Sequence, residues 1–92
     1  MSQMEIDENG TKRWCNSKGK LHRKDGPALE FTDGSKYWCI NGKCHREDGP
    51  SIENADGLKY WFIDGKEYSF DKWLDNLQVS NEEKVLLCLK WK

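Results

Sequence analysis

The predicted fold is decided by residues 37–50, which read Tyr37-Trp38-Cys39-Ile40-Asn41-Gly42-Lys43-Cys44-His45-Arg46-Glu47-Asp48-Gly49-Pro50. This segment recurs upstream as Trp14-Cys15 followed by Gly19-Lys20-Leu21-His22-Arg23-Lys24-Asp25-Gly26-Pro27. Its first half recurs downstream as Tyr60-Trp61-Phe62-Ile63-Asp64-Gly65-Lys66-Glu67-Tyr68. The turn glycines of the three copies lie 23 residues apart, and the two histidines have the same spacing. A fixed period of this length is typical of a repeat array.

Each copy contains the signals of β-hairpins. Predicted strands at 11–16, 28–32, 35–40, 51–54 and 58–63, most of them with aromatic residues, alternate with turn dipeptides. Asp33-Gly34 is typical of a two-residue type I′ turn. Asp-Gly-Pro at 25–27 and 48–50 should break the ladder, because glycine permits a positive φ and proline removes a donor. The pattern predicts an antiparallel β-meander of about three hairpin repeats over residues 10–68, with a column of tryptophans (Trp14, Trp38, Trp61) on one face.

The two ends of the chain differ from the repeats. Residues 1–9 are polar and acidic, and we expect a frayed lead-in that ends as a short strand. In 69–77 the apolar residues lie at helical spacing after Ser69, a predicted N-cap, and Ser80 with Glu83 forms a capping box that opens a second helix through about residue 90.

These two helices (69–91) are predicted to cap the open end of the sheet, since a repeat array needs a terminal element unlike its repeats. An alternative is that they leave an apolar strip for a partner or a second copy. Self-association through an open sheet edge is a related route. The strip would consist of Trp73, Leu77, Leu87 and Trp91.

Composition limits the class of protein. The chain of 92 residues is expected to form a single domain, 1–92, that is mainly β with C-terminal α. Its 15 basic residues balance 16 acidic ones, which argues against a general nucleic-acid binder. We find neither a secretory signal nor an apolar run of about 20 residues that could span a membrane. Four cysteines without a signal indicate reduced thiols, and hence a cytoplasmic location.

The segment from Trp38 to His45 resembles the Trp-x-x-Asn-Gly-Lys-x-His core of MORN-type repeats, and the period matches as well. The continuation His-Arg-x-Asp-Gly-Pro departs from the standard form, which has glycine after histidine. It is similar to a variant found in small proteins of tailed bacteriophages and bacteria. The resemblance covers residues 10–68 and implies an interaction surface. For a phage protein it implies work in the host cytoplasm, where the chain would inhibit or redirect a host protein such as a defence component.

Two interpretations compete for the repeated polar residues. In the first, the turn aspartates Asp25 and Asp48 accept backbone N–H groups and the histidines bond to a neighbouring strand. In the second, basic side chains form two rows of donors for an acidic protein surface or a phosphorylated ligand, with tyrosines as stacking surfaces. Replacing the two arginines by alanine should then weaken binding and leave thermal unfolding nearly unchanged. The candidate binding residues are Lys20, His22, Arg23, Tyr37, Lys43, His45, Arg46 and Tyr60.

The sequence contains no strong metal or catalytic signature. Cysteines 15, 39 and 44 with the two histidines could supply zinc ligands, but their spacings are wider than those of structural zinc sites. No opposed carboxylates or activated nucleophile stand out. We therefore predict a non-enzymatic protein–protein interaction module without metal or cofactor. The alternative is a protein that sequesters a phosphorylated nucleotide in the His/Arg rows.

Overall fold

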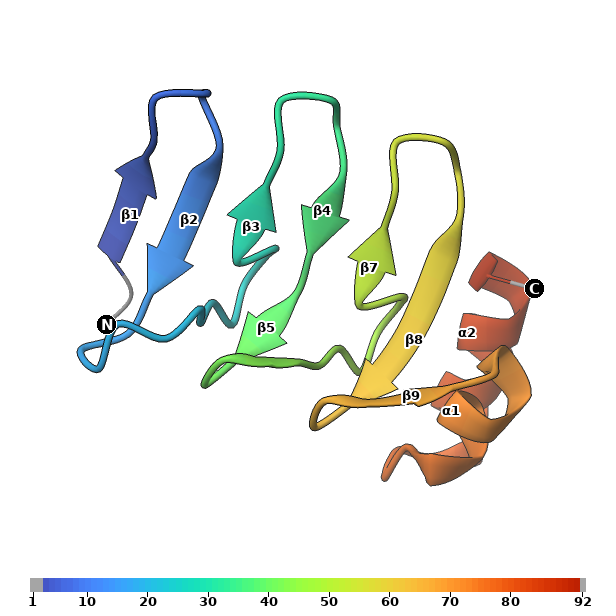
Figure 1. Ribbon diagram of the computed structural model, residues 1–92. Coiled ribbons are helices and arrows are strands. Elements are labelled where there is room, and N and C mark those ends of the chain that lie inside the picture. Colours follow the sequence, from blue (N-terminus) through green and yellow to red (C-terminus); the bar gives the residue numbers. More distant parts are fainter. Residues whose placement is uncertain (1–2, 92) are drawn as a thin grey trace.

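Three upright hairpins stand side by side in the structure, a computed structural model that describes residues 3–91 (Figure 1). The molecule is elongated, with extents of 42 × 29 × 19 Å. The strands are β1 (Gln3–Ile6), β2 (Lys12–Cys15), β3 (Leu29–Glu30), β4 (Lys36–Tyr37), β5 (Cys39–Ile40), β6 (Lys43–Cys44), β7 (Ile52–Glu53), β8 (Lys59–Ile63) and β9 (Lys66–Tyr68). The helices are α1 (Phe70–Asn76) and α2 (Asn81–Trp91).

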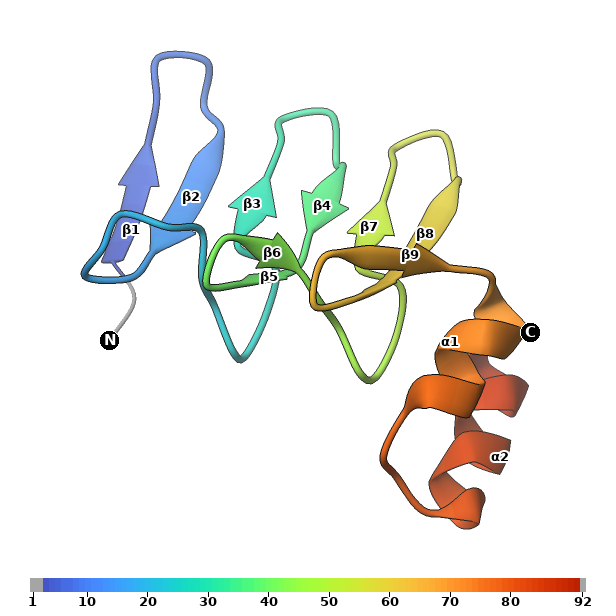
Figure 2. The same cartoon turned by 60° about the horizontal axis from the view of Figure 1, so that its bottom comes forward.

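The strands pair antiparallel in the order β1-β2-β3-β4-β7-β8-β9, and β5 pairs with β6 separately. The predicted fold class, a mainly antiparallel β structure followed by two short helices, is confirmed. The predicted strand 35–40 is divided in two, because the chain bends at Trp38 between β4 and β5. Below the bend, β5–β6 and β8–β9 form a second row of hairpins beside a single bridge between Cys15 and Leu21 (Figure 2).

The N-terminal segment contains the predicted short strand, β1, but its described residues are paired rather than frayed. All four residues of β1 pair with β2, from Gln3 opposite Cys15 to Ile6 opposite Lys12. The Asp7 carboxylate accepts the backbone N–H groups of Asn9 and Thr11 and so holds the connecting turn. Residues 1 and 2 of the predicted lead-in lie outside the described residues.

The turns are of two kinds, which the dipeptides alone did not distinguish. In the lower turns, Asn41 and Gly42 both have positive φ (50° and 82°), as a type I′ turn requires. The type I′ prediction for Asp33-Gly34 is wrong, because only Gly34 has a positive φ (97°). Phe31 N–H donates to the Ser35 carbonyl around it, so the loop has three residues. This loop closes with glycine in the left-handed region.

The apolar core lies at the C-terminal end, where the helices cover Trp61. Trp61, Trp73 and Leu77 are buried together, and Leu87 and Trp91 pack against them. The four residues predicted as a strip for a partner therefore belong to the core, and that alternative is wrong. The apolar residues that α2 exposes are Val85, Leu86 and Leu89.

Both helix starts are confirmed by their caps. The Ser69 hydroxyl accepts the backbone N–H of Lys72, and the Ser80 hydroxyl accepts that of Glu83.

Neither α1 nor α2 is long or apolar enough to cross a lipid bilayer, and residues 3–91 contain no other candidate span.

Candidate functional site

Arg46 closes the loop 46–50 over the ring of Trp38. Its guanidinium carbon lies 3.8 Å from the Trp38 ring centroid. Nε donates to Asp48 at 2.8 Å, and Nη1 donates to the Pro50 carbonyl at 3.1 Å and to Glu53 at 3.2 Å. A cation over an indole face and charge-assisted hydrogen bonds are both stabilising, and here one side chain makes both.

Arg23 makes the same set of contacts one copy earlier. Its guanidinium carbon lies 3.9 Å from the Trp14 ring centroid. Its nitrogens donate to Asp25 at 3.1 Å, to the Pro27 carbonyl at 3.2 Å and to Glu30 at 3.4 Å. In both copies, then, Nε and Nη1 are used inside the loop that follows the arginine.

The glycines of the two Asp-Gly-Pro segments make room for these arginines. Neither Gly26 nor Gly49 has a positive φ, which corrects the predicted reason for glycine there. A Cβ on Gly26 would lie 2.9 Å from the Arg23 guanidinium carbon. One on Gly49 would lie 2.7 Å from that of Arg46 and 2.8 Å from the Trp91 ring. The glycine is required because the guanidinium lies against its backbone.

Gly26→Ala should therefore lower the free energy of unfolding by about 1–3 kcal/mol, the usual cost of overpacking. Only a clash can make the change destabilising, because Gly→Ala at an unstrained, open position raises the free energy of unfolding by about 0.4–1 kcal/mol. Urea unfolding would measure the change, with Lys24→Ala in the same loop as a control that should shift it by under about 0.5 kcal/mol. Unchanged or increased stability of Gly26→Ala would contradict the packing described.

The histidines join neighbouring lower hairpins. Nδ1 of His22 accepts the backbone N–H of Asn41 at 3.0 Å, and Nδ1 of His45 accepts that of Asp64 at 3.0 Å. Because Nδ1 of His45 is an acceptor, the ring proton belongs on Nε2, which contacts Glu47 at 2.9 Å. Both histidines thus bond to the turn of the next hairpin.

The lysines Lys20 and Lys43 lie beside the same turns. A Cβ on Gly42 would meet the Lys20 stem at 3.5 Å, and one on Gly65 would meet the Lys43 stem at the same distance. These two lysines therefore run along the row of lower hairpins rather than across the Arg loops.

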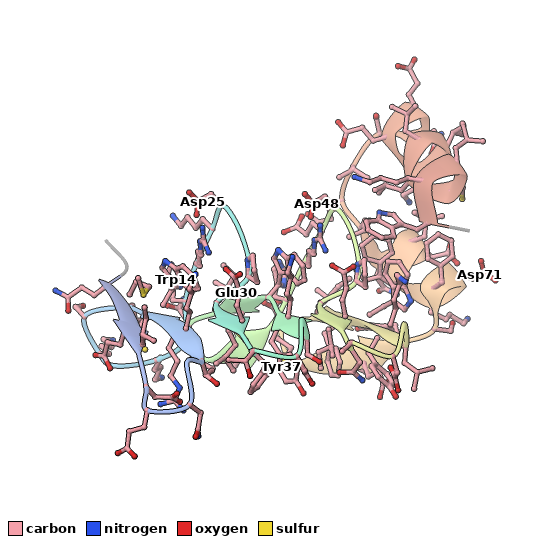
Figure 3. All side chains as sticks on the ribbon, turned by 90° about the horizontal axis from the view of Figure 1, so that it is seen from above. Trp14, Asp25, Glu30, Tyr37, Asp48 and Asp71 are labelled. Carbon is pink, nitrogen blue, oxygen red and sulfur yellow. The ribbon has the colours of Figure 1, made fainter. Side chains whose placement is uncertain are left out.

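The predicted tyrosines lie on the other face of the sheet from the arginine loops. Figure 3 shows Trp14, Glu30, Asp25 and Asp48 on one side and Tyr37 on the opposite side. Tyr60 shares the side of Tyr37 because both are directly opposite Ile52 in the register of their strands. The structure thus gathers His45, Arg46 and Arg23 around one groove and does not bring Tyr37 or Tyr60 to it.

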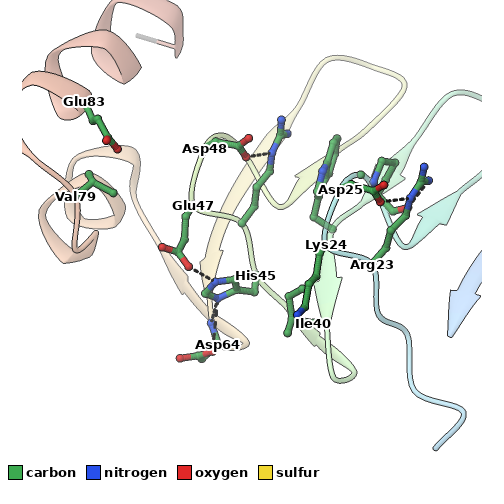
Figure 4. A pocket seen from close by; sticks show the side chains of 14 residues that line it. Arg23, Lys24, Asp25, Ile40, His45, Glu47, Asp48, Asp64, Val79 and Glu83 are labelled. Atoms are coloured by element: carbon green, nitrogen blue, oxygen red, sulfur yellow. Dashed lines mark hydrogen bonds and ion pairs between the residues drawn. The ribbon is translucent and has the colours of Figure 1, made fainter. Parts of the chain in front are cut away.

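That groove has a volume of about 860 Å³ and lies between the loop at 23–27, the loop at 45–48 and the start of α2 (Figure 4). Trp38 and Ile40 form part of its lining, and Val79 closes it on the helical side. Its charged lining residues are Arg23, Lys24, Arg46, Asp25, Glu47, Asp48, Asp64 and Glu83.

The groove is acidic. Arg23 and Arg46 each contact two carboxylates, so the positive charge of each guanidinium is balanced by its own contacts. The side chains of Asp25 and Asp48 are 88% and 81% exposed, and their carboxylates remain in contact with solvent at the rim. Glu47 and Glu83 add negative charge on the side nearer the helices (Figure 4). Among the described residues, no three His, Cys, Asp or Glu side chains are grouped to hold a metal ion.

Sequence reasoning missed most of this groove. Glu83 and Val79 reach it from the C-terminal segment, and Asp64 reaches it from the next lower turn.

Comparison of the chain with protein-family models, with curated proteins and with solved structures returned no match. The resemblance to MORN-type repeats stays a prediction, and any function is argued from the chain's own residues.

Proposed function

We propose that the chain is a non-enzymatic protein–protein interaction module whose groove receives a basic segment of its partner. The observation that carries this proposal is the charge of the groove around Trp38. Five carboxylates line it against three basic side chains. Arg23 and Arg46 are paired with Asp25 and Asp48, which leaves Glu47, Asp64 and Glu83 against Lys24. A lysine or arginine entering the groove is attracted by these carboxylates.

The same charges disfavour the alternative, a sequestered phosphorylated nucleotide. A phosphate would need the Arg23 and Arg46 guanidinium groups, whose Nε and Nη1 atoms bond to Asp25, Glu30, Asp48 and Glu53. It would also face the negative charge of Glu47, Asp64 and Glu83. A stacking role for Tyr37 finds no support, because that ring lies on the far side of the sheet (Figure 3).

The resemblance to repeat proteins of tailed phages supports a host bacterial protein as the partner. In that setting the module would act in the host cytoplasm, where it would inhibit or redirect a host factor such as a defence component. The basic segment of that factor is the feature that the groove would recognise.

Neutralising two groove carboxylates should weaken partner binding roughly tenfold, since each exposed charge pair contributes about 0.2–1 kcal/mol. The test is Glu47→Gln with Glu83→Gln, which keeps side-chain size. Binding to a partner captured from bacterial lysate would be measured by titration at low and high salt. Glu5→Gln with Glu8→Gln, on the exposed first hairpin, is the control of equal charge change.

The proposal requires the groove pair to lose affinity and the control pair to keep it. Equal affinity of both variants would contradict it. A rise in melting temperature with a nucleotide, at 1:1 stoichiometry, would favour the sequestering alternative instead.

A further inference from the structure

Two cysteines face each other across the β5–β6 hairpin. Cys39 is directly opposite Cys44, one residue pair away from the Asn41-Gly42 turn, and Ile40 is opposite Lys43 beside that turn. The carbonyls of Cys39 and Cys44 accept N–H groups of neighbouring units, from Arg23 and Gly65, and the next pair of this hairpin, Trp38 with His45, is the one joined by a backbone hydrogen bond. The pair is therefore a non-hydrogen-bonded one, in which Cα atoms are about 4.5 Å apart and side chains are closest. That separation falls at the short end of the range that a disulfide accepts.

The two thiols are unequal. Cys39 is 3% exposed, whereas Cys44 is half-buried. The hydrogen bond from Cys39 lowers the pKa of Cys44 to about 7, against the opposing effect of burial. The same hydrogen bond, together with burial, raises the pKa of Cys39. The more accessible sulfur is thus also the one that is ionised near neutral pH.

We propose that Cys39 and Cys44 form a thiol–disulfide exchange site that reacts with low-molecular-weight disulfides. The Cys44 thiolate attacks one sulfur of the small disulfide, forms a mixed disulfide and releases one small thiolate. Cys39 then loses its proton to that thiolate or to water, attacks the Cys44 sulfur and displaces the second small thiol. The protein loses two electrons and two protons, and the small disulfide is reduced to two thiols.

The reaction can be completed because the first step activates the second. Once Cys44 is in a mixed disulfide it no longer carries the negative charge that, with its hydrogen bond, raises the pKa of Cys39. Cys39 is then easier to deprotonate and lies directly across from its target. An excess of small thiol can reverse both steps by attacking the disulfide and displacing the two protein thiols in turn.

The chain contains its own comparison for this site. Cys15 occupies the position of Cys39 in the first lower hairpin, but it bridges Leu21, which stands where Cys44 would be. The geometry is repeated there with a single sulfur, so ring closure is expected only at Cys39 and Cys44. The inference does not depend on the function proposed above.

Incubation with oxidised glutathione followed by intact-mass and peptide analysis tests the site. The Cys15→Ser/Cys88→Ser variant should lose two hydrogens, and both it and the wild type should yield a peptide in which Cys39 is linked to Cys44. Reduced glutathione should reverse the change. In the same background, Cys39→Ser should instead accumulate a glutathione adduct on Cys44.

Two results would overturn the proposal. One is a stable glutathione adduct on Cys44 in the wild type with no internal disulfide, and the other is no reaction at Cys44. The Cys15→Ser/Cys88→Ser variant decides the matter alone if Cys39→Ser does not fold, because both outcomes are visible in its peptide map.

The pH dependence of Cys44 alkylation gives an independent check. The thiolate is the reactive form, so the rate in the Cys15→Ser/Cys88→Ser variant should rise with pH and level off above a midpoint of about 7. Cys39→Ala removes the hydrogen-bond donor and should move that midpoint upward, toward the ordinary thiol value of about 8.5. An unmoved midpoint would show that Cys39 does not influence Cys44.

Discussion

Replacing Trp73 by alanine should unfold the protein or lower its melting temperature by about 15–30 °C. Trp73 is fully buried, its ring lies 4.7 Å from that of Trp61, and its indole N–H donates to the Arg46 carbonyl at 2.9 Å. Truncating a buried tryptophan costs about 3–5 kcal/mol, and each kcal/mol moves the melting temperature of a domain this size by about 4–8 °C. The free energy of unfolding of a small domain is about 5–15 kcal/mol in total, so the substitution removes a large part of the stability.

Circular dichroism melts of three variants would measure this effect. Trp73→Phe keeps an aromatic ring on Trp61 but loses the hydrogen bond to Arg46, so its loss should be intermediate. Leu89→Ala, at an exposed position of the same helical cap, should be nearly silent. A Trp73→Ala variant that melts within a few degrees of the wild type would mean that the helices do not hold the end of the sheet.

Arg46→Ala should lower the free energy of unfolding by about 2–4 kcal/mol. The change removes an indole contact of up to about 2 kcal/mol and charge-assisted hydrogen bonds of about 1.5–3 kcal/mol, partly offset because Asp48 is exposed to water. Arg46→Lys should not rescue the loop, because an ammonium group cannot make the planar set of contacts to Asp48, Pro50 and Glu53.

Urea unfolding should rank three arginines by how enclosed they are. Arg46 is 14% exposed and Arg23 is 24% exposed, whereas Arg13 is 49% exposed and makes a single 3.4 Å pair with Asp7. Alanine should cost most at Arg46, less at Arg23 and under about 0.5 kcal/mol at Arg13. The structure thus favours the structural interpretation of the repeated polar residues over the binding interpretation, under which stability would hardly change. Loss of binding with unchanged unfolding in Arg46→Ala would favour the binding interpretation instead.

The regular elements followed from local signals that tertiary packing did not override. The lower turns require two consecutive residues with positive φ, a conformation that Asn41-Gly42 and Asp64-Gly65 adopt and few other residue pairs do. The aromatic runs between such turns pair as strands. Ser69 and Ser80 were recognisable as helix starts because a hydroxyl can satisfy N–H groups that the helix leaves unpaired.

A short strand was predicted in the N-terminal lead-in but its hairpin with β2 was not, because composition was given more weight than turn chemistry. Asn9-Gly10 precedes Asp33-Gly34 by 24 residues, the same interval that separates Trp14 from Trp38. That interval was sufficient to predict another upper turn, and hence a strand before it. The polar residues Gln3 and Glu5 do not prevent pairing, because the whole of β1 is exposed at the edge of the sheet.

The first lower turn is one residue longer than the two later ones, and the structure gives the reason. In the later turns, Gly42 and Gly65 donate to carbonyls of the preceding hairpin. The first turn has no hairpin before it, and Gly19 donates within the turn to the Asn16 carbonyl. The Asn16 side chain accepts two further backbone N–H groups, so the additional residue lets the turn satisfy itself.

The residue type alone did not decide whether Arg23 and Arg46 bind a ligand or hold their own loops together. A guanidinium serves equally as a ligand contact or as an internal brace, and the choice depends on which carboxylates are near it. A signal was present, since a glutamate follows each arginine by seven residues, as Glu30 and Glu53 do. In the third copy, Ser69 stands at the position of the arginine, and Trp73 covers Trp61 instead.

Photo-crosslinking from the groove is the most direct test of the proposed binding mode. With p-benzoylphenylalanine in place of Glu83, the captured partner should be linked through a segment that contains lysine or arginine, and high salt should suppress the link. The same group in place of Phe31, which lies beside Tyr37 on the opposite face, should give little or none. Crosslinks from position 31 alone, or from position 83 to an acidic segment, would contradict recognition of a basic segment by this groove.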